Sequence, residues 1–543
     1  VYCVPKNVVR QFEREFYQVC PSAKILVLDS STLPDNITSI HYDVKPKMEL
    51  REDRNGKKKL VAVKDADGVP IFEKVKVSDE EAKKREVRLA KRNAALNQIL
   101  THDWDAIIMS HETFQRLPMS DEYMMQFRTE ELEKYKRALA EEQAEERQAG
   151  KKSKSLKNIQ EKIAKLEGKL NALIAKKQAK DFESPSLEDL GIDQLFVDEA
   201  ETFKNLEVMT KYGQVKGISE SAADRSFDML MKTRYLLHSP NAHGVVFATG
   251  TPISNSVVEL YTMCRYLNDD SLKRLGVDSF DQFAKMFIDI WQTEVPAQDG
   301  SGYEYKTAVR GLRNAPECIN LFKEFADVKM VEDLPYIAAA RPKAKRVAVA
   351  IEESAWNKRF KKDIRARVAA IKSSGRKDPP MINSKSKESK AHFAKTGEYL
   401  QVADSPLLVA DNLRKASLAP FIVDYSLTGV EGYGKVWACA DKIYEEWKDS
   451  SDRHGAQLVF CDQSIPDRSS NDPNVYDALK SRLIELGIPE SDIAFVQDAK
   501  TDKAQAALFE AVNEGRVRVL IGSTQKMGAG TNMQHKLVAL HHL

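Results

Sequence analysis

Short apolar runs rich in β-branched residues recur along the chain, and each is followed by turn or polar residues and then by a helical pattern. The runs cover residues 24–28, 106–109, 194–197, 244–248, 457–460 and 517–521. This alternation is typical of βα units and of a mainly parallel sheet. Because the runs fall before about residue 270 and after about residue 425, the pattern predicts two α/β lobes, at residues 1–270 and 426–543, joined by a mostly helical connector at 271–425.

Residues 124–180 carry the period of an amphipathic helix. In the second half of this segment the apolar positions recur at alternating steps of three and four: Leu156, Ile159, Ile163, Leu166, Leu170 and Leu173. The first half repeats the steps at Leu132, Tyr135 and Leu139, and the polar segment 150–155 separates the halves. The pattern predicts an antiparallel, coiled-coil-like helical hairpin inserted into the first lobe at residues 118–183, with arms of about 40 Å. Since its seam can close between the two arms, we expect a modular insertion.

Two further segments interrupt the α/β pattern. Residues 42–75 alternate basic and apolar positions around the turn dipeptides at 55–56 and 67–68. They predict a small β insertion leading into a charged helix, which together cover residues 42–100. Residues 361–395 hold 11 Lys and Arg against three acidic residues. A segment with such an excess of positive charge can bind along a phosphate backbone, although runs of charged residues are more often solvated loops.

The composition is that of a highly charged chain in which the two signs nearly cancel. Of the 543 residues, 30% are charged, with 83 Lys and Arg against 81 Asp and Glu, so a nucleic-acid surface would have to be local. The six cysteines are scattered singly without a CxxC pair, which gives no zinc ribbon or disulfide framework and fits a reducing, cytoplasmic setting. No run approaches the roughly 18 apolar residues that a membrane-spanning helix needs, so we expect no membrane partner.

Paired carboxylates end one of the predicted strands. The strand at 194–197 runs into Asp198 and Glu199, and adjacent acids at the tip of a buried strand are costly without a function. In nucleotide-hydrolysing α/β lobes the first carboxylate holds Mg²⁺, and the second orients or polarises the attacking water. The next strand ends in Thr249, Gly250 and Thr251. There the glycine permits a tight approach, and the hydroxyls can bond the carboxylates of the adjacent strand.

These segments resemble motifs II and III of the Swi/Snf-type helicase-like ATPases of helicase superfamily two. That family usually has DEAH followed by KN, and TGTP followed by N and EL; this chain has VDEAETFKN at 197–205 and ATGTPISNSVVEL at 248–260. Further similarities follow in the family's order: residues 4–15 with motif Ia, 106–113 with the Ib region, 413–420 with the helix before the second lobe, 457–462 with motif IV and 521–532 with motif V. The resemblance covers both lobes but not the insertions.

The resemblance implies an α/β fold of two RecA-like lobes and a motor that couples ATP hydrolysis to movement along double-stranded DNA, with ATP and magnesium as cofactors. Asp198 and Glu199 would hold the magnesium and handle the catalytic water. The residues expected to couple the nucleotide site to the DNA path are Glu201, Thr249, Gly250, Thr251, Ser523, Thr524, Gly528, Gly530 and Asn532. The resemblance also implies DNA contacts at Pro5, Lys6, Ser110 and His111. Lys372, Arg376 and Lys377 are expected to contact DNA because of the basic charge of segment 361–395, not because of the resemblance.

Two departures from the family's pattern bear on these expectations. Glu201 stands where the family usually has His, which puts the coupling between the lobes in doubt. The chain contains no GxxxxGK[ST] phosphate loop, which in the family lies just before motif Ia, and the family's motif VI would follow Leu543. We therefore expect both lobes to be truncated at the chain ends and the parent to be a bacterial phage or mobile-element protein of the methyltransferase-helicase type. The fragment alone should hydrolyse ATP negligibly.

Alternative interpretations stay open. The missing phosphate loop favours a non-catalytic DNA-binding or assembly module built on helicase lobes. The hairpin is more commonly a solvated protrusion than a partner-binding arm, but a protein partner at 124–180 is the alternative. An RNA helicase of the DEAD type is disfavoured by the KN extension after motif II and by the large insertions. His111 and His243, beside strands, are more often structural histidines than ligands, and Cys461 is more often a small core or surface residue than a nucleophile.

Overall fold

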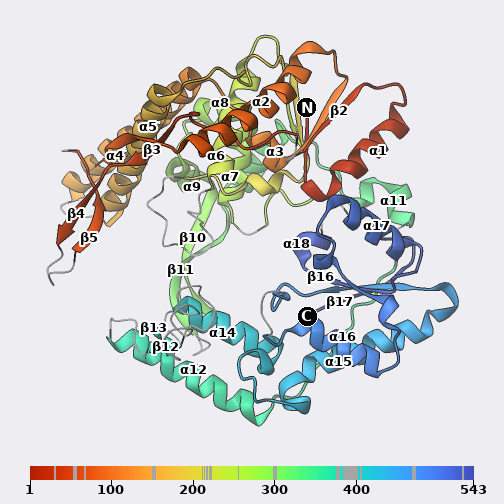
Figure 1. Ribbon diagram of the computed structural model, residues 1–543. Coiled ribbons are helices and arrows are strands. Elements are labelled where there is room, and N and C mark those ends of the chain that lie inside the picture. Colours follow the sequence, from red (N-terminus) through yellow and green to blue (C-terminus); the bar gives the residue numbers. More distant parts are fainter. Residues whose placement is uncertain are drawn as a thin grey trace. The chain divides into compact units, whose positions relative to one another are not determined.

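The computed structural model divides the chain into two compact units (Figure 1). Unit 1 holds Val1–Thr293 and Lys306–Leu334, and unit 2 holds Glu294–Tyr305 and Pro335–Leu543. The structure describes residues 1–29, 32–52, 58–65, 69–149, 154–208, 210, 212, 215, 218, 223–254, 256–296, 303–340, 342–374, 380–382, 401–403, 406–467, 472–528 and 531–543.

Unit 1 is built on a five-stranded parallel sheet in the order β2-β7-β1-β8-β9. The strands are β2 (Ile25–Leu28), β7 (Ala106–Ser110), β1 (Tyr2–Val4), β8 (Gln194–Val197) and β9 (Gly244–Phe247). Successive side chains of a strand point to opposite faces of its sheet. Accordingly, Val4 of β1 joins one apolar cluster with Ile108, whereas Cys3 joins another with Met109. The sheet is therefore buried on both faces.

Helices cover the two faces of this sheet (Figure 1). α1 (Val9–Val19) packs Val9 and Phe12 into the first cluster. The opposite face is covered by α2 (Asp79–Thr101), α3 (His111–Gln115) and α6 (Asp224–His238), through residues such as Leu96, Phe114 and Leu230. The prediction of an α/β fold with parallel strands flanked by helices is confirmed in this unit.

The predicted helical hairpin is present as α4 (Asp121–Ala149) and α5 (Lys154–Ala179), which pack along one another. Its seam is a separate apolar cluster, made of the predicted positions Leu132, Tyr135, Ile159, Ile163 and Leu166, with Leu139 and Leu170 partly buried at its edge. The steps of three and four between apolar residues are therefore enough to specify how the two arms pair.

The base of the hairpin belongs to the core of unit 1, which differs from the modular insertion expected from the sequence. Phe127 of α4 joins the apolar cluster of the sheet, and its ring centre lies 5.6 Å from that of Phe227 on α6. One turn further along α4, Glu131 accepts hydrogen bonds of 2.9 and 3.0 Å from the buried guanidinium of Arg265. The heptad pattern misses these contacts because it records only the residues that face the other arm.

The insertion between β2 and α2 consists of two antiparallel ribbons. β3 (Tyr42–Pro46) pairs with β6 (Phe72–Lys76), and β4 (Met48–Glu52) pairs with β5 (Lys58–Ala62). Helix α5 packs against β3 and β6, and Lys74 of β6 donates a hydrogen bond of 2.5 Å to the carbonyl oxygen of Gln178. The two insertions that the sequence shows separately thus pack together.

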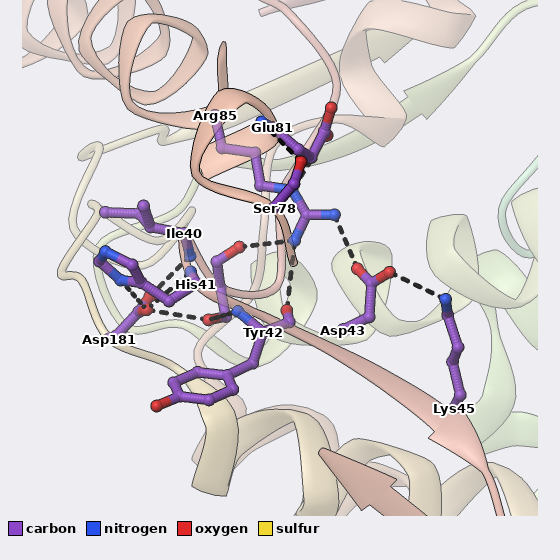
Figure 2. Close-up of polar contacts among 10 residues, drawn as sticks. Ile40, His41, Tyr42, Asp43, Lys45, Ser78, Glu81, Arg85 and Asp181 are labelled. Atoms are coloured by element: carbon purple, nitrogen blue, oxygen red, sulfur yellow. Dashed lines mark hydrogen bonds and ion pairs between the residues drawn. The ribbon is translucent and has the colours of Figure 1, made fainter. Parts of the chain in front are cut away.

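A polar cluster at the exit of the hairpin, shown in Figure 2, fixes this contact. Asp181 accepts hydrogen bonds from the backbone amides of Ile40 and His41, at 2.7 and 3.0 Å. Burial would raise the pKa of Asp181, but these bonds outweigh it and lower the pKa to about 2, so the carboxylate is ionised. Arg85 of α2 forms an ion pair of 2.7 Å with Asp43 on β3. It also donates to two backbone carbonyl oxygens, those of Ser39 and Tyr42.

Unit 1 continues past residue 270, where the sequence placed the end of the first lobe. Four helices share a third apolar cluster there: α7 (Val258–Leu267), α8 (Asp269–Arg274), α9 (Phe280–Phe287) and α10 (Ala315–Lys323). A two-stranded ribbon, β10 (Ile288–Pro296) with β11 (Tyr303–Leu312), separates α9 from α10. The prediction of a mostly helical connector missed this ribbon. Its signal was the hairpin turn dipeptide Asp299-Gly300 between two runs rich in β-branched and aromatic residues.

Unit 2 contains a four-stranded parallel sheet in the order β15-β16-β14-β17. The strands are β15 (Ile493–Phe495), β16 (Val519–Gly522), β14 (Ala456–Phe460) and β17 (Leu537–His542). α15 (Gly429–Asp449) and α16 (Val475–Glu485) pack on one face with Val459, and α17 (Asp502–Asn513) packs on the other with Leu458. Cys461 is buried in the first of these clusters, and burial raises its pKa to about 11. Of the two positions expected for it, core or surface, Cys461 occupies the core.

The remaining elements of unit 2 are mainly helical. They are α11 (Pro335–Ala340), α12 (Ala355–Ser374), β12 (Pro380–Ile382) paired with β13 (Gln401–Ala403), α14 (Pro406–Leu418) and α18 (Thr524–Met527). Short 3-10 helices lie in both units: η1 (Lys6–Val8), η2 (Ala200–Phe203), η3 (Val331–Asp333), η4 (Pro420–Ile422), η5 (Ser451–Arg453), η6 (Glu490–Asp492) and η7 (Val496–Asp498). None of the helices in the described residues is both long and apolar enough to cross a membrane.

Candidate functional site

The paired carboxylates lie at the carboxyl end of β8, next to the central strand of the unit 1 sheet. The amide of Asp198 donates to the carbonyl oxygen of Cys3 at 2.9 Å, so the sheet hydrogen bonding continues one residue beyond β8. Glu199 then has a φ of 48°, in the left-handed region that residues other than glycine rarely occupy. Its neighbour Ala200 is fully buried and begins η2. Backbone strain of this kind tends to be kept at functional sites.

The Glu199 carboxyl group lies beside other acids and titrates abnormally. A hydrogen bond with Glu201, partial burial, and the negative charges of Glu201 and Asp198 raise the pKa of Glu199 to about 7. Near neutral pH this side chain can therefore hold or release a proton. A carboxylate with a pKa close to the working pH is suited to general base catalysis.

A hydrogen bond joins the ends of β8 and β9. The hydroxyl of Thr249 donates to a carboxylate oxygen of Glu201 at 2.5 Å, and the same hydroxyl accepts from the amide of Thr251 at 3.0 Å. The departure from the family's His at position 201 thus leaves a direct link between the segments that resemble motifs II and III. In contrast, a Cβ at Gly250 would meet no described atom within 4 Å. Close packing within the unit does not require glycine there.

A second link between these segments involves residues to which the sequence assigned no role. Lys204, just after η2, forms an ion pair of 3.2 Å with Glu259 in the first turn of α7, and it also donates to the hydroxyl of Ser254. The amide of Ser254 donates to Glu259 at 2.5 Å. The signal for both charged residues was their place in the KN and EL positions of the resemblance. Together they fix the start of α7 to the acidic end of β8.

Two of the residues expected to contact DNA are instead used inside unit 1. The Ser110 hydroxyl caps α3 by accepting from the amide of Thr113 at 3.1 Å. His111 is mostly buried, which lowers its pKa, and its Nε2 donates to the carbonyl oxygen of Asp198 at 2.8 Å. His111 is therefore a structural histidine that holds the acidic turn. Of the other two residues on this edge, Lys6 is exposed on η1 and Pro5 is partly buried before it.

The segment that resembles motif V forms its own contacts in unit 2. Thr524 donates from its amide and its hydroxyl to the Asp462 carboxylate, at 2.6 and 2.8 Å, and this connects the segment to the residues after β14. Ser523 is buried, and Asn532 is exposed. A Cβ at Gly528 would lie 2.5 Å from the carbonyl oxygen of Thr524, so the close approach requires glycine at that position.

Several predicted site residues fall outside these contacts. Gly530, Arg376 and Lys377 lie outside the described residues. Lys372 belongs to the last turns of α12.

The acidic residues at the end of β8 can bind magnesium only together with other ligands. Among the described residues, no group of three or more His, Cys, Asp or Glu is arranged to hold a metal ion. Mg²⁺ bound with a nucleotide, however, takes one or two protein carboxylates and completes its coordination with phosphate oxygens and water. The partly exposed Asp198 and Glu199 provide that donor set. The site therefore suits a magnesium-nucleotide complex rather than a metal ion held by protein alone.

Comparisons with known proteins place a helicase-like region in unit 1. Residues 74–330 match a family described as a probable helicase domain. The defense against restriction protein B of Escherichia phage P1 is 24% identical over 286 residues, which are 52% of this chain and 12% of that protein's length. A crystal structure of the Hef helicase domain from Pyrococcus furiosus is similar with a TM-score of 0.22 and 10% identity, over 100% of this chain and 92% of that one. The match to the probable helicase domain family confirms the helicase-like part of the resemblance, and its Swi/Snf type stays a prediction.

Proposed function

We propose that the chain is part of an ATP-dependent motor of the Swi/Snf type that moves along duplex DNA. The observation that carries the proposal is the geometry of Glu199. This residue follows a buried parallel strand, adopts a rare left-handed conformation and has a pKa raised to about 7. Strain and an abnormal pKa at the same partly exposed carboxylate are characteristic of a catalytic group.

The side chains around the site have distinct roles in this proposal. Bound ATP would supply the phosphoryl group, and the magnesium ion bound with it would offset the negative charge of the phosphates. Asp198 would hold that ion through a carboxylate oxygen, and Glu199 would orient the attacking water and accept its proton at the carboxylate. Thr249 holds the neighbouring carboxylate of Glu201 at 2.5 Å, which keeps a second acceptor beside Glu199. Lys204 and Glu259 connect this turn to α7.

The test is Glu199→Gln in the natural protein that carries this chain, because the sequence described here contains no phosphate loop. Loss of the proton acceptor should lower steady-state ATP hydrolysis at least about 100-fold, while nucleotide binding is retained. Glu86→Gln is the matched control, since Glu86 is exposed on α2 and distant from the site in sequence. Hydrolysis that survives in Glu199→Gln would remove Glu199 from the catalytic role.

The chain by itself gives a complementary measurement. Without the lysine and backbone cradle for the phosphates, the purified chain should hydrolyse ATP negligibly with or without DNA. Robust magnesium-dependent turnover by the chain alone would contradict this expectation. If the natural protein binds duplex DNA but neither hydrolyses ATP nor displaces a third strand from a triplex, the non-catalytic DNA-binding module is the better account.

A further inference from the structure

Helix α12 of unit 2 has two faces of different character. Its inner face carries Trp356, Phe360 and Ile364, spaced four residues apart, and Ile364 is 1% exposed. The Trp356 and Phe360 rings stack with centres 4.7 Å apart, and the helix packs against α14. The indole N–H of Trp356 donates to Asp424 at 3.1 Å, and its amide donates to Glu431 at 3.0 Å. The helix is therefore held on unit 2 by its apolar side.

The outer face of α12 is basic. Lys358, Lys362 and Arg365 follow one another at steps of four and three, which places them on one side of the helix, opposite the Ile364 stripe. All three are exposed, and within the described part of the chain none of their side chains makes a hydrogen bond or a close ion pair. Lys358 has a longer-range electrostatic interaction with Glu353, whose carboxylate pairs directly with Lys361. Arg359, also exposed, lies beside them. Between residues 355 and 367 the only acidic residue is Asp363. The charges of this face are thus available to a partner.

The chemistry of the face selects the class of partner. An anionic membrane would require apolar side chains at the surface of the helix, but the apolar side of α12 is used against unit 2. A protein partner is normally anchored by exposed aromatic or aliphatic side chains, and the outer face has none between Lys358 and Arg365. Only a dense array of negative charges matches such a face. Lys358 and Arg365 are about 10 Å apart along the helix axis, and one DNA strand places about three phosphates in that length.

We propose that the basic face of α12, formed by Lys358, Arg359, Lys362 and Arg365, binds the phosphate backbone of duplex DNA. This site is separate from the acidic turn after β8, and its assignment to DNA rests on the proposed motor function. It overlaps the basic segment 361–395 only at Lys362 and Arg365, it does not include Lys372, Arg376 or Lys377, and its exposed cations begin before residue 361 on a folded helix. Binding through the backbone makes the contact independent of base sequence.

The experiment compares two triple substitutions in the chain. Lys358→Gln, Lys362→Gln and Arg365→Gln together remove the outer face, and glutamine preserves helix propensity. The control is Lys83→Gln, Arg88→Gln and Lys91→Gln, which removes the same residue types from exposed positions of α2, a helix that also carries Asp79, Glu80, Glu81 and Glu86. Affinity for a fluorescent 30-base-pair duplex is measured by anisotropy at several salt concentrations, with circular dichroism to verify that each variant is folded.

The α12 variant should bind at least ten-fold more weakly at low salt, and the slope of log K against log salt should become shallower by about 2 to 3, close to 0.9 for each phosphate that is no longer neutralised. The α2 variant should match the unsubstituted chain. If both variants bound DNA equally weakly, the effect would come from the net charge alone, and the proposal would be overturned. An unchanged salt slope in the α12 variant would also overturn it. Tighter binding of a duplex RNA of the same length would overturn the assignment to DNA. ATP hydrolysis by the Glu199→Gln variant is measured in a separate assay. A failure of the DNA-binding proposal can therefore be distinguished from a failure of the proposed motor function.

Discussion

The guanidinium of Arg265 is almost completely enclosed, and the carboxylate that accepts its hydrogen bonds is that of Glu131. Arg265 is 7% exposed and Glu131 5% exposed, and the two are joined by hydrogen bonds of 2.9 and 3.0 Å. Removing one member of a buried pair leaves the other charge without compensation, which costs about 3 to 5 kcal/mol. Glu131→Gln should therefore lower the free energy of unfolding of unit 1 by about that amount in urea denaturation. Glu133→Gln, at an exposed position of the same helix, should change it by less than about 0.5 kcal/mol.

The same pair predicts the direction of the pH dependence. Burial would raise the pKa of Glu131, but Arg265 and Lys134 outweigh it and lower the pKa to about 2. A carboxyl group whose pKa is lower in the folded state stabilises that state above its ordinary pKa and loses this contribution as the pH falls toward the folded value. The unfolding free energy should thus decrease between about pH 4.5 and pH 2. Glu131→Gln should show a flatter profile over this range, and a profile identical to that of the unsubstituted chain would contradict the assignment.

At the scale of residues, the sequence located the acidic site but not all of its contacts. Asp198 and Glu199 were identifiable because two acids directly follow an apolar run. The bond from Thr249 to Glu201 was expected in kind, since adjacent parallel strands end at the same edge of a sheet. The hydrogen bond between His111 and Asp198 was not predictable from the sequence, because it depends on how β7 and β8 are ordered around β1. A motif shows which residues come together only once the strand order is known.

At the scale of elements, the hairpin of α4 and α5 contacts the rest of unit 1 at its base and also further along α5. Phe127, Glu131 and Asp181 contact the core or the β insertion, and Lys162 donates to the carbonyl oxygen of Val208 at 3.1 Å. The apolar seam from Leu132 to Ile163 is satisfied between the arms. Replacing residues 124–180 with a short Gly/Ser linker should therefore yield insoluble protein or a much lower melting temperature, since it removes Phe127 and the partner of Arg265. This reverses the expectation from the heptad pattern alone.

A shorter deletion provides the control. Replacing residues 142–157 keeps Leu139 and Ile159 and shortens only the distal part of the arms, and closing a loop of similar length adds little entropy cost. That variant should stay soluble and melt within a few degrees of the full chain, as measured by differential scanning fluorimetry. If both deletions melt alike, the base contacts contribute little, and the hairpin is the modular insertion that its apolar spacing predicts.

The strands and helices that the sequence predicted correctly have strong local signals. β7, β8, β14 and β16 are compact apolar runs buried in the centres of their sheets, and α5 shows the helical period over its described length. The ribbon of β10 and β11 was missed although its sequence alternates apolar and polar residues, as in Ile288-Asp289-Ile290 and Tyr303-Glu304-Tyr305, because it lies between helical segments outside the two predicted lobes. Its pairing depends on contacts that form only when the chain turns back on itself, which residue-by-residue periodicity does not contain.

At the scale of the whole molecule, the near-neutral charge limits how the chain can attract DNA. The formal net charge is +2, too small to provide a long-range field, so affinity must come from local basic surfaces. Contacts to phosphates carry no sequence information. The chain should therefore bind two duplexes of equal length and unrelated sequence with affinities within about two-fold at fixed salt.

The salt dependence distinguishes this mode of binding from base recognition. Each phosphate neutralised by Lys or Arg releases counterions, so log K should fall linearly with log salt. A face with four exposed cations, such as Lys358, Arg359, Lys362 and Arg365 on α12, should contribute a slope of about −3 to −4. Anisotropy titrations from about 50 to about 200 mM salt on both duplexes measure the slope and the sequence preference together. A strong preference for one duplex, with a slope near zero, would mean that the chain reads base edges, and it would place the main DNA contact outside α12.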